Sequence, residues 1–186
     1  MPKTEASSVD FVALALDQHQ SGLIRYATSI LGDVERAREV VQDTFLKLCQ
    51  QRPSKLKDHV AQWLFTVCRN RAFDVRKREQ RTQPLTVVDL ETRPGPGPRP
   101  LEMLEREEVI AQVLEFVEGL PEREREVITL KFQCELSYKE ISAVTDLSVS
   151  NVGFLIHNGM KRVRSQIKAT SPSTPSTAPV LARRSQ

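Results

Sequence analysis

Residues 137–168 read SYKEISAVTDLSVSNVGFLIHNGMKRVRSQIK, and this stretch indicates the fold more clearly than any other. Ser137 and Glu140 have the spacing of a capping box, in which a hydroxyl and a carboxylate each accept a backbone amide at a helix start. Ser148 is a second cap candidate, so the first helix must end just before it. From there onward apolar residues recur at helical spacing for about five turns. A short helix, a tight turn and a longer helix are the arrangement of a DNA-binding helix-turn-helix.

Four positions test the helix-turn-helix spacing. The small residue of the first helix, the turn residue and two later apolar residues correspond to Ser142, Asp146, Val152 and Leu155. Asp146 stands where glycine is usual, but aspartate tolerates a left-handed backbone better than most residues. Because two-helix corners also occur in proteins that never touch DNA, a protein-binding helical module stays open.

The long helix ends in a cluster of positive charge. Its members are Lys161, Arg162, Arg164 and Lys168. Such side chains neutralise phosphates without reading the base sequence, and they favour DNA binding over the alternative.

Proline marks the domain boundaries. Five of the eleven prolines lie in PLTVVDLETRPGPGPRP (84–100), and three more lie in SPSTPSTAP (171–179). Proline donates no backbone hydrogen bond, and together with glycine it resists both helix and sheet. The sequence therefore predicts a folded unit at 8–83, a linker at 84–100, a second folded unit at 101–168, and a disordered Ser/Thr/Pro tail at 169–186.

The first unit has helical periodicity throughout. Residues 11–16 fit a short first helix, and a second helix carrying Leu23 stops at Gly32. Asp33 can cap the next helix, and Asp58 can cap a long helix that runs to the linker.

The second unit also reads as helices. One ends at Gly119, and Pro121 suits the first position of the next, which carries Val127, Ile128, Leu130 and Phe132. No segment alternates with the period of two that a strand requires. The predicted fold class is all-α, with two small helical domains joined by a Pro/Gly-rich linker and a helix-turn-helix in the second.

The total charge of +3 conceals three segments of opposite sign. Residues 1–83 carry a net charge of +4, residues 84–136 carry −6, and residues 137–186 carry +5. Two basic segments around an acidic one suggest separate contact surfaces for a polyanion. Solvated helix faces are the alternative explanation.

A second basic cluster lies at the end of the first unit. Six cations crowd residues 69–81, namely Arg69, Arg71, Arg76, Lys77, Arg78 and Arg81. The aromatic residues Trp63, Phe65 and Phe73 lie in the same predicted helix. Rings among cations suit single-stranded or distorted nucleic acid, where a ring stacks on an unpaired base, although each ring can equally belong to the core.

Several function classes are disfavoured. The longest apolar run is residues 11–16, so no membrane span is expected, and no basic segment followed by an apolar one marks a secretion signal. The three cysteines and three histidines are scattered without metal-ligand spacing, so we expect no metal, no cofactor and no disulfide framework. No phosphate-cradling glycine loop or carboxylate cluster points to an enzyme. A cytoplasmic, non-enzymatic protein is expected.

Three stretches resemble a known family. AREVVQDTFLKLCQ (37–50), VAQWLFTVCRNRAFDVRKREQR (60–81) and LPEREREVITLKFQCELSYKEISAVTDLSVSNV (120–152) are similar to the extracytoplasmic-function sigma factors of bacterial RNA polymerase. The match covers both predicted units, in the family's order and with a linker between them. The resemblance implies a sigma factor with regions 2 and 4 of the sigma-70 family, which directs core polymerase to promoters and assists promoter melting.

The resemblance implies roles for individual residues. For binding the polymerase clamp it points to Gln42, Asp43, Phe45, Leu46 and Lys47. For reading and melting the −10 element it points to Lys57, His59, Gln62, Asn70, Arg71, Asp74, Lys77 and Arg78. For the −35 element it points to Ser150, Asn151, Gly153, Phe154, His157 and Asn158 in the groove, with Lys161 and Arg162 near phosphate.

The expected recognition helix departs from the family's pattern. Many members carry basic residues where this chain has Gly153, Leu155 and Asn158, so the helix is less basic and more apolar than usual. Phe154 can touch a thymine methyl, and Asn151 or Asn158 can pair with adenine, which predicts an A·T-leaning −35 element. The alternative is that Phe154 packs on protein.

The implied partners are core RNA polymerase, promoter DNA and an anti-sigma factor that hides these surfaces. The competing interpretation is a stand-alone helix-turn-helix regulator, which binds promoter DNA without core polymerase, usually as a dimer on a two-fold site.

Overall fold

A computed structural model describes residues 3–56, 58–82 and 101–170, and every regular element in these ranges is a helix. The prediction of an all-α fold is therefore confirmed. In chain order the elements are α1 (Lys3–Leu31), α2 (Val34–Cys49), α3 (Pro53–Leu56), α4 (Val60–Thr82), α5 (Leu101–Glu118), α6 (Glu122–Ile128), the π-helix η1 (Thr129–Gln133), α7 (Tyr138–Thr145) and α8 (Val149–Thr170).

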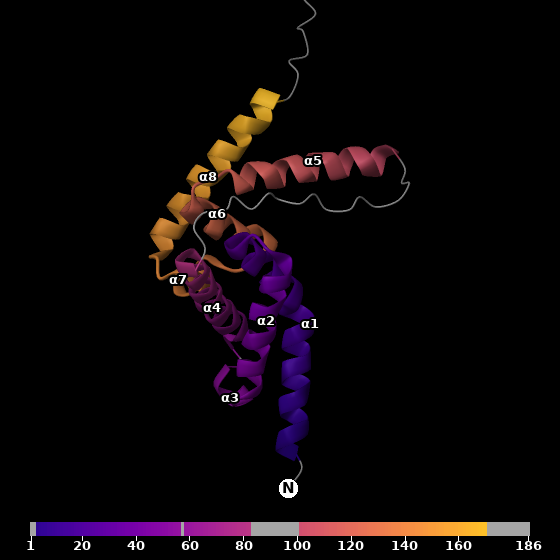
Figure 1. Ribbon diagram of the computed structural model, residues 1–186, viewed down its shortest axis with the longest axis vertical. Coiled ribbons are helices and arrows are strands. Elements are labelled where there is room, and N and C mark those ends of the chain that lie inside the picture. Colours follow the sequence, from indigo (N-terminus) through magenta and orange to yellow (C-terminus); the bar gives the residue numbers. More distant parts are fainter. Residues whose placement is uncertain (1–2, 57, 83–100, 171–186) are drawn as a thin grey trace, which may run out of the picture.

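Helices α1 to α4 form the first unit. The long helices α1, α2 and α4 pack on one another pairwise, and the short α3 closes one end (Figure 1). Their shared core is formed by fully buried side chains such as Leu23, Tyr26, Leu48 and Phe65. Asp33 caps α2 as predicted, because its carboxylate accepts the Arg36 amide at 2.9 Å.

The prediction of two separate helices before Gly32 is wrong. Residues 3–31 form one continuous helix, which Gly32 ends with a positive φ of 73°. Gly22 does not break the helix, and the space around it would accept a methyl group at ordinary van der Waals distances. A Cβ placed there would lie 3.5 Å from the Phe65 ring and 3.9 Å from the Cβ of Cys134, which belongs to the second unit.

Helices α5 to α8 form the second unit. Its own small core, where α5 and α6 pack on α8, consists of Val117, Leu120, Ile128 and Val163.

Two local features of the second unit differ from the sequence prediction. Pro121 precedes α6 rather than starting it. After Ile128 the chain widens into the π-helix, which shifts the helical register and leaves Phe132 55% exposed. Sequence periodicity alone does not reveal that shift.

The two units pack against each other. Helix α4 lies along α7, and α1 meets η1, while α5 and the end of α8 extend away from α1–α4 (Figure 1). One continuous core cluster joins residues of the first unit, such as Leu64 and Phe65, to residues of the second, such as Val127, Leu130 and Ile141.

Some predictions fall on residues that the structure does not describe. The linker at 84–100, all but the first two residues of the tail at 169–186, and Lys57 lie outside the described residues. Within the described ranges, no helix is long and apolar enough to cross a membrane. The same ranges contain no group of three or more His, Cys, Asp or Glu side chains that could hold a metal ion.

Candidate nucleic-acid interface

The helix-turn-helix forms through the two predicted caps. The Ser137 hydroxyl accepts the Glu140 amide at 3.3 Å, and the Glu140 carboxylate accepts the Ser137 amide at 2.8 Å. Helix α7 ends at Thr145, and its C-cap Asp146 has a φ of 59° and a ψ of 34°, the left-handed conformation that the turn position requires. The Ser148 hydroxyl then accepts the Asn151 amide at 3.2 Å and starts α8. The capping box and the turn are both confirmed.

Helix α8 has one buried and one outward face. Val152, Ile156, Gly159 and Val163 are buried against α6 and α7. On the opposite face, residues at helical spacing form a stripe that we call the α8 stripe, consisting of Ser150, Phe154, His157, Lys161, Arg164 and Lys168, all of which are exposed. The stripe begins with polar and aromatic side chains and ends with cations.

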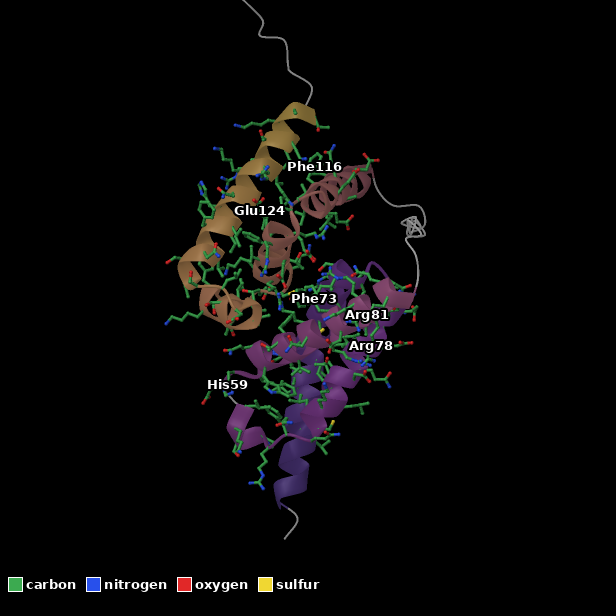
Figure 2. The ribbon with its side chains drawn as sticks, turned by 60° about the vertical axis from the view of Figure 1, so that its left-hand side comes forward. His59, Phe73, Arg78, Arg81, Phe116 and Glu124 are labelled. Carbon is green, nitrogen blue, oxygen red and sulfur yellow. The ribbon has the colours of Figure 1, made fainter. Side chains whose placement is uncertain are left out.

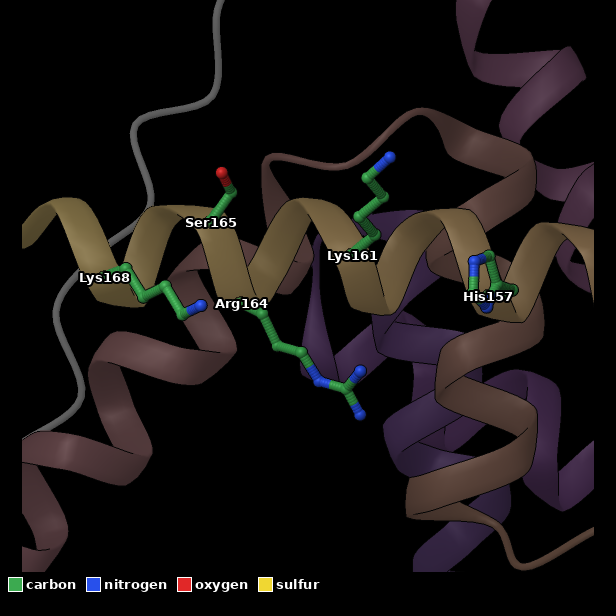
Figure 3. A pocket seen from close by; sticks show the side chains of 5 residues that line it. All are labelled: His157, Lys161, Arg164, Ser165 and Lys168. Atoms are coloured by element: carbon green, nitrogen blue, oxygen red, sulfur yellow. The ribbon is translucent and has the colours of Figure 1, made fainter.

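The second half of the α8 stripe borders a shallow surface depression. His157, Lys161, Arg164, Ser165 and Lys168 line it, and all five come from α8 (Figure 3). A row of cations along one exposed helix face can follow a phosphate backbone. Lys161, Arg164 and Lys168 belong to the basic cluster that the sequence assigns to phosphates, although Arg164 and Lys168 are not among the −35 residues that the resemblance implies. Ser165 belongs to neither set, although helical spacing from Lys161 places it near the same face.

The other predicted −35 residues divide into two groups. Asn151 is exposed beside the stripe. Gly153 and Asn158 are half-buried at its flank, and a Cβ on Gly153 would lie 3.6 Å from the Tyr138 ring. Arg162 places its Nε 3.1 Å from a carboxylate oxygen of Glu124, an ion pair that ties α8 to α6. Leu155 is half-buried and packs against the core.

The predicted −10 residues lie mostly on the exposed side of α4. His59, Asn70, Asp74, Lys77 and Arg78 are exposed, whereas Gln62 and Arg71 are half-buried. Asn70, Asp74, Lys77 and Arg81 follow one another at helical spacing and form a polar stripe. His59 lies just before the helix, at the end of the unit near α3 (Figure 2).

Carboxylates hold three arginines of the six-cation cluster. The Arg71 Nη2 atom lies 2.9 Å from Oδ2 of Asp43 on α2. The Arg76 Nη1 atom lies 2.7 Å from Oε1 of Glu122 on α6. Arg69 donates from Nε to Glu126 of α6 at 2.7 Å. Two of these three acids come from the acidic middle of the sequence, so the second unit supplies counter-charge to the basic cluster of the first.

The aromatic residues of α4 have different roles. Phe65 is 1% exposed in the core, and Trp63 packs against that core while half-buried. Phe73 lies where the two units meet (Figure 2). Its ring faces two guanidinium groups, with its centroid 4.7 Å from Arg69 and 4.5 Å from Arg76. For Phe65, the alternative that the ring belongs to the core is therefore correct. The Phe73 ring instead contacts two cations of its own helix.

Glu126 is the most enclosed charged group of this contact. It is 7% exposed, and it accepts hydrogen bonds from the Tyr26 hydroxyl at 2.8 Å and from Arg69. Burial, followed by the neighbouring charge of Glu126, raises the pKa of Tyr26 well above its usual range. The hydrogen bond from Arg76 lowers the pKa of Glu122. No pattern in the sequence points to Tyr26.

The predicted polymerase-binding residues occupy two faces of α2. Gln42, Leu46 and Lys47 are exposed, and Leu46 retains 56% of its accessible surface. Phe45 is 6% exposed in the core, and Asp43 is half-buried beside Arg71. The outward face of α2 therefore carries Gln42, Leu46 and Lys47 of this predicted set.

Comparison with known proteins places both units in one family. The family model "Sigma-70 region 2" matches residues 15–82, and "Sigma-70, region 4" matches residues 110–163. The chain is 28% identical over 133 residues to the ECF RNA polymerase sigma factor RpoE of Cereibacter sphaeroides, covering 69% of this chain and 71% of RpoE. It is 26% identical over 147 residues to the ECF RNA polymerase sigma factor SigM of Bacillus subtilis, covering 78% of this chain and 88% of SigM.

The fold is also similar to that of a solved structure. The sigma factor RpoE from Bartonella quintana, crystallised with the anti-sigma factor NepR, superimposes with a TM-score of 0.63. That match covers 91% of this chain and 99% of the other at 18% sequence identity.

Proposed function

This chain belongs to the extracytoplasmic-function group of the sigma-70 family, and we propose how its parts divide the work of directing RNA polymerase core to promoters. The observation that carries the function is that regions 2 and 4 match two helical units of one chain in the family's order. A stand-alone helix-turn-helix regulator would not need the first unit. The family consists of transcription initiation factors, and we expect this chain to have no catalytic activity of its own and to act in the cytoplasm.

We propose that the α8 stripe enters the major groove of the −35 element. Ser150, Phe154 and His157 lie at the N-terminal half of the helix, which is the half that reads base edges in helix-turn-helix proteins. Lys161, Arg164 and Lys168 then follow the phosphate backbone and supply affinity without sequence preference. Gly153, Asn158 and Arg162 belong to the flank and act by positioning the helix.

The exposed stripe of α4 is our proposed −10 surface. Asn70 and Asp74 offer hydrogen-bonding groups to bases, and Lys77 and Arg81 offer charge to the strand that separates during melting. Trp63 lies at helical spacing from Asn70 and is half-buried, so part of its surface remains accessible. This arrangement supports contact with unpaired bases at one end of α4 and with phosphates at the other.

We propose that the outward face of α2 binds the polymerase clamp. Gln42, Leu46 and Lys47 combine an exposed apolar side chain with polar neighbours, the composition typical of a protein interface. Because Asp43 pairs with Arg71, it also couples this helix to α4.

An anti-sigma factor is the proposed regulator. One solved structure that shares this fold is the complex of the sigma factor RpoE with the anti-sigma factor NepR. Another is CnrH in complex with the cytosolic domain of CnrY. The second matches with a TM-score of 0.59 and 24% identity, and it covers 86% of this chain and 89% of CnrH. We expect a partner of this chain to bind surfaces that polymerase also needs.

Core binding and transcription test the function directly. The full chain mixed with core polymerase is expected to co-elute with it and to support specific transcripts that core alone does not make. The variant Lys47→Glu combined with Gln42→Ala should weaken co-elution about tenfold or more, since a reversed charge in a protein interface is costly. Lys55→Glu, an exposed reversal on α3, is the matched control and should change little. Equal binding by both variants would contradict the α2 assignment, and no transcript from any template would contradict the function.

A further inference from the structure

Helix α5 has an apolar face that the other described helices cover only in part. At its C-terminal half, Val113, Phe116 and Val117 pack with α8 in the small core of the second unit. One turn earlier on the same face, Val109 and Ile110 are 60% and 51% exposed, and they belong to neither apolar core cluster of the described residues. The apolar face therefore continues beyond the part of α5 that α8 covers.

Negative charge lies beside the exposed part of this face. Glu108, which is exposed, directly precedes Val109, and α5 as a whole contains six glutamates against one arginine. We call the surface formed by Glu108, Val109, Ile110 and the half-buried Leu114 the α5 face. A segment that binds the α5 face must combine apolar side chains with positive charge, because burial of apolar area and complementary charge both favour the contact.

The chain that follows α8 has this chemistry. Residues 171–186, which lie outside the described residues, contain one pair of branched aliphatic side chains, Val180 and Leu181, and one pair of charges, Arg183 and Arg184. The same segment contains no aspartate or glutamate. Because the two pairs lie within five residues, one short stretch of chain can bring both to the α5 face.

The chain between α8 and these residues is long enough to reach the α5 face. Ile167, in the last turn of α8, packs against the core that α8 shares with α5, and α8 ends at Thr170. Val180 follows ten residues later, and ten extended residues span up to about 33–36 Å. Val109 is two helical turns before Phe116, which is only about 10 Å along the axis of α5. The required span is therefore well within reach.

Charge favours this segment over two other candidates for the same face. The predicted linker at 84–100, which also lies outside the described residues, contains two acids, Asp89 and Glu91, against two arginines. Such a neutral segment gains little from the glutamates of α5. A second copy of α5 would bring the same negative charge to the contact and would be repelled.

We propose that residues 180–184 bind the α5 face of the same chain. The aliphatic pair of this segment covers Val109 and Ile110 and removes their side chains from water, and its arginine pair meets the glutamates of α5. The contact uses no residue of the α8 stripe and none of the exposed stripe of α4. It is therefore independent of the surfaces proposed for promoter DNA.

A spin label near the C-terminus tests the contact in the full chain. Gln186→Cys is labelled in a Cys49→Ser background, where the remaining cysteines are the buried Cys68 and the half-buried Cys134. Amide signals are then compared by NMR with the label oxidised and reduced. The expected result is a loss of the signals of residues 108–112 in the oxidised state, with the signals of residues 42–47 on α2 retained. Retention of the signals of 108–112 would overturn the proposal, and it is also the result expected if the linker covers the face.

Substitutions on α5 test the apolar part of the contact. Val109→Ser together with Ile110→Ser should restore the signals that the label removes. Both side chains are exposed, so the helix should stay packed through Val113 and Phe116. Leu14→Ser, an equally exposed apolar side chain on α1, is the matched control and should leave the loss of signal unchanged. If the α5 variant keeps the full loss of signal, the α5 face is not the binding site.

Charge reversal tests the arginine pair. Arg183→Glu with Arg184→Glu should also restore the signals of residues 108–112. Arg52→Glu with Lys55→Glu changes the net charge by the same amount at two exposed positions of the first unit and should have no effect. Equal effects of the two reversals would refute a specific contact with the C-terminal segment.

A mixed sample distinguishes contact within one chain from contact between copies. Isotope-labelled chain without the spin label is combined with spin-labelled chain that carries no isotope. We expect the signals of residues 108–112 to be retained in this mixture, because the segment binds its own α5. Their loss in the mixture to the same extent as in the singly labelled chain would assign the α5 face to a second copy and overturn the proposal.

Discussion

Phe154 lies in the middle of the N-terminal half of α8 and is 62% exposed. Single exposed apolar side chains are common on protein surfaces, so the exposure makes the ring available to a partner without identifying one. The thymine methyl group in the major groove is the apolar feature that such a ring can contact. The prediction made from the sequence, an A·T-leaning −35 element, therefore depends on this one side chain more than on its neighbours.

Replacing thymine by deoxyuridine removes only that methyl group. We expect wild type to bind the thymine-containing −35 element about four times more tightly at the contacted position, corresponding to about 0.8 kcal/mol for one buried methyl-sized group. Phe154→Ala should lose this preference while keeping the salt dependence. Fluorescence anisotropy with the two DNA duplexes measures it. An unchanged preference in Phe154→Ala, or G·C-rich selected elements, would contradict the assignment.

The three cysteines differ in burial, so the reactivity of each thiol reports on the packing around it. Cys49 is exposed, whereas Cys68 is buried in the first unit and Cys134 is half-buried between the units. Burial raises the pKa of both Cys68 and Cys134 to about 12. Only the thiolate reacts, so their thiolate populations at pH 8 are lower by roughly a thousandfold than that of an ordinary cysteine of pKa about 8.5.

We expect one fast and two slow thiols when the folded chain is titrated with Ellman's reagent at about pH 8. Cys49→Ser should abolish the fast phase, and at least a hundredfold should separate it from the slow ones in wild type. Urea should bring all three thiols to the fast rate. A fast Cys134 beside a slow Cys68 without denaturant would show that the contact between the units is open in solution.

At the scale of elements, the second unit depends on how closely α6 and α8 approach. Gly159 permits the contact, because a Cβ there would lie 2.5 Å from Cδ1 of Ile128 and 3.4 Å from Cβ of Glu124. Gly153, on the same helix, faces only Tyr138 at 3.6 Å. The two glycines therefore differ in what a methyl group would meet.

Gly159→Ala and Gly153→Ala should have opposite effects on stability. The first forces Ile128 aside and should cost about 1–2 kcal/mol, the overpacking penalty less the gain in helix propensity. The second gains about 0.5–1 kcal/mol, because alanine restricts the unfolded chain without a clash. Urea unfolding followed by circular dichroism measures both. Equal stability changes in the two variants would contradict the close packing of α6 on α8.

The elements also show what local sequence can and cannot predict. The caps at Asp33, Ser137 and Ser148 are predictable because each depends on residues within one turn. The uninterrupted α1 is not, because Gly22 is placed there in contact with Cys134, far along the chain. The π-helix after Ile128 is not predictable for a similar reason, since its register is set by packing rather than by a local motif.

At the scale of the whole molecule, the sequence predicts which side chains are exposed. It does not predict which charged side chains form ion pairs with each other. The α8 stripe follows from helical spacing alone, and most of its members belong to the set predicted from the sequence. The six cations of α4 repel one another unless negative charge lies nearby. From the composition of the cluster we expect nucleic acid to supply that charge rather than carboxylates of the protein itself. Glu122 and Glu126 lie in a separate unit, and only the tertiary structure brings them to Arg76 and Arg69.

The proposed function assigns α8 to one promoter element and α4 to another. In the structure α4 lies along α7, and two of its arginines pair with carboxylates of α6. We therefore expect a chain that is closed when free and extended when active, with the predicted linker at 84–100 between the units.

Transcription from a randomised promoter library is the sharpest test of a sigma factor with two DNA-reading units. The full chain and core polymerase are incubated with the library, and the templates that yield transcripts are sequenced and aligned on their start sites. We predict two enriched sequence blocks separated by a constant spacing, the upstream block rich in A·T pairs, and neither block without the added chain. A single enriched block, or no transcripts above those of core polymerase alone, would contradict this division of labour.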